Sequence, residues 1–316
     1  MGADTLTLKN SRKVDGNKRL GYLRSHFSLY TMIVPGFLLF LIFCYFPMYG
    51  IVMAFQSFKP SLGFFASPYV GLKHFVRLFN DPYFLTTMKN TVILGFYSLI
   101  IGFPAPIVLA LLFNEIKHTA FKRVMQTISY MPYFLSTVIV IGIIRDMLSV
   151  NDGVINQLLA AVGIGKIDFF TSPEWFRTIY IGSGLWQGIG FSTIIYLAAI
   201  TGVNPEIYES ATIDGATRLK QSIYITIPSI LPTIMILFIF AVGGILGNDF
   251  QKILLIYNPS TYSTSDVIST YVYRSGIEGA SQSYSAAVGL FMSVLSLILL
   301  AITNYLSKKF GETSLW

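Results

Sequence analysis

The sequence predicts an all-α membrane protein with six transmembrane helices. Hydrophobic residues make up 53% of the 316 residues and charged residues only 12%, about half the share of roughly 25% that is usual in soluble domains. The few charges cluster between long uncharged stretches, each close to the roughly 20 residues that a helix needs to cross a bilayer. This distribution excludes a typical soluble domain and indicates a chain that crosses a membrane several times.

The N-terminal residues 1–28 are polar and are predicted to form a cytoplasmic tail. Their basic residues are Lys9, Arg12, Lys13, Lys18, Arg19 and Arg24. The apolar stretch 29–55 that follows is too long for the hydrophobic part of a signal peptide and lacks a small-residue cleavage site. It is therefore predicted to remain as the first transmembrane helix, bent by Pro35 and Pro47, since membrane helices tolerate proline when neighbouring groups satisfy the freed carbonyls.

An outer loop over residues 56–90 precedes a core, residues 91–306, that contains five further apolar stretches. These stretches are Thr91–Phe113, Val124–Ile144, Ile179–Thr201, Ser229–Leu246 and Ala286–Leu306. The fifth span of the chain ends among Gly243, Gly244 and Gly247, and such small residues let helices approach closely in membrane bundles. Residues 307–316 are predicted to form a short C-terminal tail in the cytoplasm.

The orientation follows from the distribution of lysine and arginine. With the N-terminus inside, thirteen basic residues fall in cytoplasmic segments and nine in outer segments. Basic residues favour the cytoplasmic side, and the first helix usually dominates the orientation. The polar loop 204–228, between the fourth and fifth spans, is therefore predicted to face the cytoplasm.

Several classes of function are not supported by the sequence. The net charge of +7 is explained by membrane topology, so nucleic-acid binding is not expected. The three histidines, His26, His74 and His118, are far apart and have no metal-ligand spacing, which speaks against a membrane-embedded enzyme. The single cysteine, Cys44, allows no intramolecular disulfide. We expect no catalytic residue, metal site or cofactor on this chain.

If a membrane chain with six spans moves a solute, this sequence indicates that the energy comes from another protein. Ion-coupled carriers keep charged or titratable groups inside the membrane, but the central parts of the six predicted spans contain none. A phosphate-binding loop requires the pattern Gly-x-x-x-x-Gly-Lys-Ser/Thr. The nearest match, Gly163-Ile164-Gly165-Lys166, is followed by Ile167 where a hydroxyl is needed. An ion-coupled or channel-like sugar carrier remains the alternative to a chain driven by a separate ATPase.

The loop 204–228 contains a predicted pair of short helices. Asn204-Pro205-Glu206 is typical of a helix start, and Gly215 allows the chain to turn. A second short segment, Ala216–Tyr224, leads into the fifth span. Such a pair would fit the cleft of a partner, with Glu209 as its charged contact, although a routine amphipathic loop with a glycine turn explains the same residues. Arg218 and Lys220 would serve either the partner or the positive-inside bias.

The spacing of this loop resembles that of the cytoplasmic coupling loop in ABC importer permeases. Glu209-x-Ala211 is followed after three residues by Gly215, and after nine more by Ile225-x-Ile227-Pro228. Ser210 stands where the family often has alanine, and Ile227 where leucine is common. Ser67–Phe75 and Phe79–Phe84 look like the first outer loop of carbohydrate-uptake permeases. Three further runs are similar to the branch that imports oligosaccharides or polysaccharide fragments: Leu112–Ile116, Gln126–Pro132 and Tyr196–Ile200.

The resemblance implies a type I importer permease fold in a bacterial cytoplasmic membrane, with both termini in the cytoplasm. It implies transport of a glycan substrate by alternating access, in a chain that contacts membrane lipid. The implied protein partners are a second permease as heterodimer partner, two ATPase subunits that bind ATP and Mg, and an extracellular solute-binding lipoprotein. The residues expected to couple the chain to the ATPase are Glu209, Ala211, Asp214, Gly215, Ala216, Arg218 and Pro228.

The fourth span carries side chains that suit a sugar. Aromatic rings pack on the apolar faces of pyranoses, and a few polar groups fix the orientation of a ligand in an apolar cavity. Trp186 and Gln187, with Tyr196 further along the helix, have this chemistry and are candidates for the substrate pathway. The alternative is that Trp186 packs against neighbouring helices and Gln187 bonds to a backbone carbonyl.

Overall fold

The computed structural model describes residues 26–311, so the tails predicted at 1–28 and 307–316 lie largely outside the described residues. In this part of the chain the secondary structure is helical apart from an isolated antiparallel bridge between Gln56 and Tyr69. The chain divides into two units, residues 1–52 and 53–316. The absence of strands in the described part agrees with the predicted all-α class.

The first unit contains the helix that starts the described chain. It runs without a break through α2 (Phe27–Phe40), η1 (Leu41–Tyr45) and η2 (Phe46–Phe55), whose last residues belong to the second unit. Pro35 lies inside α2. The whole helix, Phe27–Phe55, is long and apolar enough to cross a membrane, and nearly all of its side chains are exposed. An apolar helix with so little of its surface buried is suited to a lipid environment.

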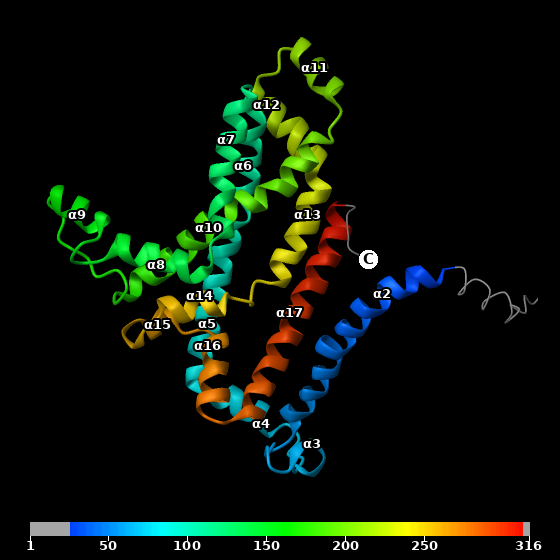
Figure 1. Cartoon of the computed structure of the whole chain (residues 1–316), viewed down its shortest axis with the longest axis vertical. Helices are drawn as coiled ribbons and strands as arrows, with labels where there is room; N and C mark the ends of the chain where they lie inside the picture. The colour runs from blue at the N-terminus through cyan, green and yellow to red at the C-terminus, as the bar shows by residue number, and fades with distance from the viewer. Residues whose placement is uncertain (1–25, 312–316) are drawn as a thin grey trace, which may run out of the picture. The chain divides into compact units, whose positions relative to one another are not determined.

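The second unit contains four further helices of spanning length (Figure 1). They are Pro82–Glu115, made of α5 (Pro82–Tyr97), η3 (Ser98–Gly102) and α6 (Pro104–Glu115); α10 (Pro173–Thr201); Arg218–Gly243, made of α12 (Arg218–Gln221), η5 (Ser222–Thr226) and α13 (Ile227–Gly243); and α17 (Gln282–Gly311). Several begin or end beyond the predicted apolar stretches, because local signals extend them. Asp81, for example, caps α5 by accepting a hydrogen bond from the Tyr83 backbone N–H at 2.9 Å.

The third predicted span, Val124–Ile144, is not one straight helix. It is formed by α7 (Thr119–Tyr130), η4 (Met131–Phe134) and α8 (Thr137–Leu148), with a bend of 103° between the two halves. Pro132 begins the tight turn and cannot donate a backbone hydrogen bond. Ser136 then starts α8 as its N-cap. The described chain therefore has five spanning helices, or six when the bent pair counts as one span.

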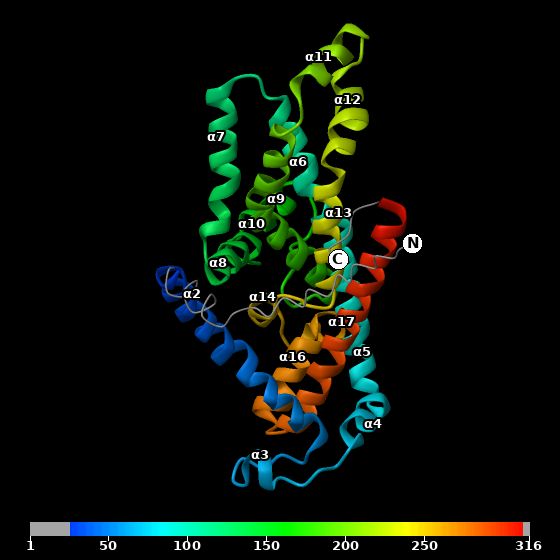
Figure 2. The same ribbon diagram turned by 90° about the vertical axis from the view of Figure 1, so that its right-hand side faces the viewer.

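Short helices occupy the ends and sides of the second unit. They are α3 (Gly63–Ala66), α4 (Lys73–Asn80), α9 (Val154–Ala161), α11 (Pro205–Ile213), α14 (Phe250–Ile256), η6 (Pro259–Thr261), α15 (Tyr262–Ser265), α16 (Ile268–Tyr273) and η7 (Arg274–Glu278). Figures 1 and 2 show α11 at one end of the second unit and α4 and α16 towards the other. The long helix α10 passes through the middle and packs on α6, α7, α13 and α14.

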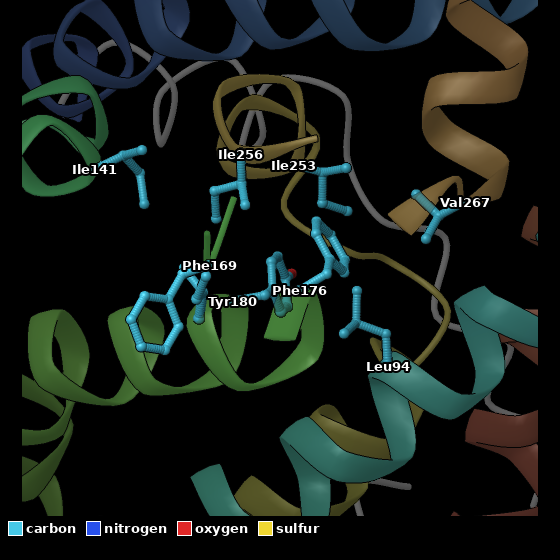
Figure 3. Packing of buried hydrophobic residues seen from close by; sticks show 9 residues of the cluster. Leu94, Ile141, Phe169, Phe176, Tyr180, Ile253, Ile256 and Val267 are labelled. Carbon is cyan, nitrogen blue, oxygen red and sulfur yellow. The ribbon is translucent and has the colours of Figure 1, made fainter. Parts of the chain in front are cut away.

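Three buried apolar clusters hold the second unit together. One joins α10 to α14 and α8, and Figure 3 shows Phe176 and Tyr180 of α10 facing Ile253 and Ile256 of α14. A second joins α4, α5, α16 and α17 around Tyr284. The third joins α6, α10 and α13 around Tyr196. The first and third clusters fix α14 and α13 against α10, and so position the walls of the cavities described below.

Candidate functional site

The short helix α11 begins and ends with residues that define its limits. Asn204 is the N-cap, and its side chain accepts a hydrogen bond from the Glu206 backbone N–H at 3.1 Å. At the other end Gly215 has a φ of +75°, a conformation that costs other residues free energy. The Gly215 N–H donates to Thr212 O at 3.1 Å and the Ala216 N–H to Ala211 O at 2.9 Å. This pair of bonds is the Schellman arrangement that ends a helix and turns the chain.

The segment after α11 differs from the prediction of a second separate short helix over Ala216–Tyr224. Thr217 starts α12, and the helix continues through η5 into α13 as one element of 26 residues. The reason is that Ser222–Thr226 keeps helical backbone angles, and Pro228 lies in the first turn of α13, where its missing N–H does no harm. The second half of the loop is thus the end of the fifth span itself.

Side-chain bonds fasten α11 to this span. The Tyr208 and Thr226 hydroxyls lie 2.9 Å apart, and the Gln221 side-chain amide donates to Thr212 Oγ1 at 3.0 Å and to Ala216 O at 3.2 Å. These bonds link α11 to α12 and to the start of α13.

Arg218 makes its described contacts within the chain. Its NH1 lies 2.7 Å from Glu115 Oε2, at the end of α6. Like Arg218, the predicted coupling residues Glu209, Asp214, Gly215 and Pro228 are exposed, whereas Ala211 and Ala216 are half-buried in the turn.

The sequence reasoning missed the apolar part of this loop. Ile213 is 87% exposed and Leu219 71% exposed, on the two sides of the Gly215 turn. Together with the exposed Glu209, they form a surface of mixed apolar and acidic character, which we call the α11 tip. Ile213 and Leu219 are two of several large apolar residues in the loop 204–228, so the sequence alone did not single them out.

A cavity of about 470 Å³ lies between α5, η3, α10 and α13. A second cavity of about 200 Å³ adjoins it and shares the walls Ser98, Gly102, Pro106, Tyr180 and Ser192. The larger cavity is also lined by Tyr196 and Asn248, and the smaller one by Lys252. Tyrosine rings, hydroxyls and an amide in a mostly apolar space are the kind of lining that binds and orients a polar ligand.

The structure does not bring the three predicted substrate residues to one place. Tyr196 lines the larger cavity, whereas Trp186 lines a separate, almost wholly apolar hollow with Ile143 and Trp175. The Gln187 side-chain amide donates to Leu135 O at 3.0 Å, at the bend between η4 and α8. The assignment of these residues to the substrate pathway stays a prediction.

Alanine variants separate the two interpretations of Trp186 and Gln187. If the side chains contact the substrate, Trp186→Ala and Gln187→Ala should each lower uptake several-fold while the chain remains assembled in the membrane. The measurement is initial uptake by reconstituted vesicles, normalised to the amount of assembled protein. Unchanged uptake in both variants would contradict the prediction.

The chain is similar to several known proteins. Residues 102–312 match the family described as binding-protein-dependent transport system inner membrane component. The chain is 46% identical, over 91% of its length and 90% of the relative's, to the polygalacturonan/rhamnogalacturonan transport system permease protein YteP of Bacillus subtilis (strain 168). It is 29% identical, over 90% of both, to the arabinooligosaccharides transport system permease protein AraP of the same organism.

A solved structure has the same fold over nearly the whole chain. A crystal structure of a bacterial ABC transporter involved in the import of the acidic polysaccharide alginate contains a chain with 42% identity and a TM-score of 0.86. The match covers 93% of this chain and 99% of that one. A further crystal structure shows that transporter in complex with an alginate pentasaccharide-bound periplasmic protein, with the same identity and TM-score.

Proposed function

We propose, since the chain belongs to the family of binding-protein-dependent transport system inner membrane components, that it carries an oligosaccharide or polysaccharide fragment through the membrane. As a permease of this family it is a non-catalytic translocation subunit of an ATP-driven importer, and ATP is hydrolysed on a separate chain. The cargo is proposed from the relatives, whose names include oligosaccharide and polysaccharide transport, together with the tyrosine and hydroxyl lining of the two cavities.

The observation that carries the proposal is the link between the α11 tip and the wall of the larger cavity. The tip is exposed, and α11 is bonded to the beginning of the Arg218–Gly243 helix. The far end of that helix, from Leu237 to Gly244, lines the cavity. A partner that binds the tip and moves it would therefore shift the cavity wall, because hydrogen-bond networks and packed helices carry energetic coupling between distant sites.

Alternating access follows from this arrangement. When the ATPase subunits close on ATP and Mg, they would move the α11 tip and rock α13 against α10, which opens the cavities to one side of the membrane and closes them to the other. The energy of each step comes from the partner, and this chain supplies the path and the mechanical connection. Rigid-body movement of packed helices is a common form of such switching.

The partners and the location extend the proposal. A second permease would complete the translocation path, two ATPase subunits would bind the α11 tip, and a solute-binding lipoprotein would deliver the glycan from outside. We place the chain in the bacterial cytoplasmic membrane with the N- and C-termini in the cytoplasm, because the thirteen basic residues of the cytoplasmic segments outnumber the nine outside.

The test is affinity purification of the tagged chain in mild detergent, with its partners identified by mass spectrometry. We expect a second permease and an ATPase to co-purify with the unaltered chain. The Glu209→Ala, Gly215→Pro double variant should lose at least about nine-tenths of the ATPase and keep the second permease. Gly215→Pro should abolish ATPase binding because proline cannot adopt the φ of +75° found at Gly215. The turn that presents the α11 tip would then be lost.

A matched control uses the same substitutions elsewhere in the second unit. Glu174→Ala with Gly165→Pro alters the start of α10 and the loop before it, where a Cβ at Gly165 would meet no atom within 4 Å. This variant should retain both partners. If the unaltered chain is intact but recovers neither partner, an autonomous ion-coupled or channel-like carrier is favoured and the coupling role of the α11 tip is wrong.

A further inference from the structure

Lys252 is a buried cation in the wall of the smaller cavity. Its side chain is only 9% exposed, and it is the one charged residue among the described residues that line either cavity. Burial of a charge without full compensation is costly. A retained buried cation beside a cavity therefore suggests that its compensating group is supplied by a ligand.

The chain itself satisfies the Lys252 ammonium incompletely. Its one ion pair among the described residues is with Asp249, whose Oδ2 lies 3.9 Å from Nζ, beyond hydrogen-bond distance. The ring of Tyr180 lies 5.5 Å from Nζ and adds a weak cation–π attraction. Burial lowers the pKa of Lys252 below its ordinary value, and the Asp249 carboxylate acts in the opposite direction.

The position of the ammonium is fixed by its surroundings. Asp249 Oδ1 caps α14 by accepting the Lys252 backbone N–H at 3.0 Å, and the Asp249 N–H donates to the Tyr180 hydroxyl at 2.9 Å. Ile253 and Ile256 hold α14 on α10, as Figure 3 shows. A Cβ at Gly184 would stand 3.0 Å from Nζ, so the glycine provides the space that the ammonium occupies beside the cavity.

A second cation, Arg177, lies on α10 itself, whereas Lys252 belongs to α14. Arg177 precedes Gly184 by seven residues, or about two helical turns. Its Nε is buried without a hydrogen-bond partner among the described residues, and its NH2 reaches Asn90 Oδ1 only at 3.4 Å. Arg177 is thus a second cation with incomplete partners, but it lines neither cavity and is not part of the site proposed below.

We propose that Lys252 binds a carboxylate of the cargo, which makes the carried oligosaccharide one that contains uronic acid residues. This inference rests on the proposed function, because it assumes that the two cavities hold the carried sugar. The carboxylate would supply the acceptor that the ammonium lacks, and the Ser98 and Ser192 hydroxyls, which the two cavities share, would bind sugar hydroxyls beside it. Two relatives are named for acidic polysaccharides, polygalacturonan and alginate.

The test compares two trisaccharides that differ only in charge. A trimer of galacturonic acid carries three carboxylates, and the trimer of galactose with the same linkage carries hydroxymethyl groups in their place. Binding of each is measured by calorimetric titration of the purified complex of this chain with its partner permease and ATPase, without the binding protein, so that the selectivity of that protein does not contribute.

We expect the acidic trimer to bind the unaltered complex at least about tenfold more tightly than the neutral trimer, because a hydrogen bond between two charged groups is stronger than one between neutral groups. Lys252→Met and Lys252→Gln should abolish this preference without changing the affinity for the neutral trimer. Lys166→Met, at an exposed lysine in the loop before α10, should keep it.

Other results would overturn the inference. Equal affinities of the unaltered complex for both trimers, no binding of the acidic trimer, or a preference that survives in both Lys252 variants would each show that Lys252 does not recognise a carboxylate. If the ATPase is present in the same preparation, the proposed function stands in all of these cases. Failure to recover any ATPase with the unaltered chain would overturn the proposed function and the inference together.

Discussion

Gly190→Ala is expected to remove most of the folded, assembled chain from the membrane. A Cβ at Gly190 would lie 2.0 Å from Ser129 O and 2.9 Å from the Tyr130 backbone N, so it meets the backbone of α7, which cannot move aside as a flexible side chain can. Overpacking of this kind costs about 1–3 kcal/mol and sometimes more. A loss of 1–2 kcal/mol already changes cellular abundance several-fold.

The measurement is the amount of monodisperse protein in detergent, determined from the size-exclusion peak of a fluorescent fusion. Gly182→Ala is the matched control on the same helix, because a Cβ there meets no atom within 4 Å. We expect a several-fold lower peak for Gly190→Ala and little change for Gly182→Ala. Equal peaks for the two variants would show that α10 and α7 do not pack as closely as described.

The glycine contacts also show which close approaches between helices can be predicted from the sequence. The glycines at the end of the fifth span were expected to allow close approach. Gly243 does lie against the Leu300 side chain, since a Cβ at Gly243 would be 2.8 Å from Leu300 Cδ1. The tightest contacts, however, involve Gly95 against Ile245 O and Gly190 against Ser129 O. A single glycine within an apolar helix carries no sign of its partner, since that depends on how distant segments pack.

Local signals predicted the α11 helix well because they act over a few residues. Asn204, Pro205 and Gly215 define its limits through backbone geometry alone, and each has that role in the structure.

The bend in the third span was missed although Pro132 and Ser136 are both present. Apolar composition dominated the prediction there, and a helix stop followed directly by a helix start was read as one span.

The burial of a charged residue, in contrast to the limits of α11, could not be predicted from local signals. Lys252 was counted among the basic residues of an outer loop, because its neighbours in sequence resemble a polar connection. The structure places it in a cavity wall, since Ile253 and Ile256 bind α14 to α10. Burial of a charge depends on tertiary packing, so the sequence contained no sufficient signal for this residue.

Asp266→Ala is expected to lower the free energy of unfolding by about 3–5 kcal/mol. Asp266 is 1% exposed and binds the Arg274 guanidinium through both carboxylate oxygens, at 2.9 and 2.5 Å. It also accepts hydrogen bonds from the Tyr83 hydroxyl at 2.5 Å and from Thr270 Oγ1 at 2.6 Å. These contacts tie α5, α16 and η7 together. The substitution leaves a largely buried cation and the Tyr83 hydroxyl without the carboxylate, whereas the Thr270 hydroxyl keeps Val267 O as an acceptor at 2.9 Å.

Burial decides the size of this effect. The ion pair between Arg218 and Glu115 has a comparable separation of 2.7 Å, but its side chains are 55% and 35% exposed, and exposed pairs contribute about 0–1 kcal/mol. Glu115→Ala is therefore the matched control. Thermal unfolding of the solubilised chain should show a clearly lower midpoint for Asp266→Ala and almost no change for Glu115→Ala. Similar midpoints for the two variants would show that the Asp266 pair is accessible to solvent.

The double variant Asp266→Leu, Arg274→Met separates the two parts of the loss. Replacing both members of a buried ion pair by apolar residues is often neutral or stabilising, so the double variant should be more stable than Asp266→Ala. It should remain below the unaltered chain, because the half-exposed Tyr83 hydroxyl still lacks the carboxylate that accepts from it, whereas Thr270 keeps Val267 O. If the double variant is as unstable as Asp266→Ala, the lost hydrogen bonds to the carboxylate account for the loss, and the unpaired guanidinium contributes little to it.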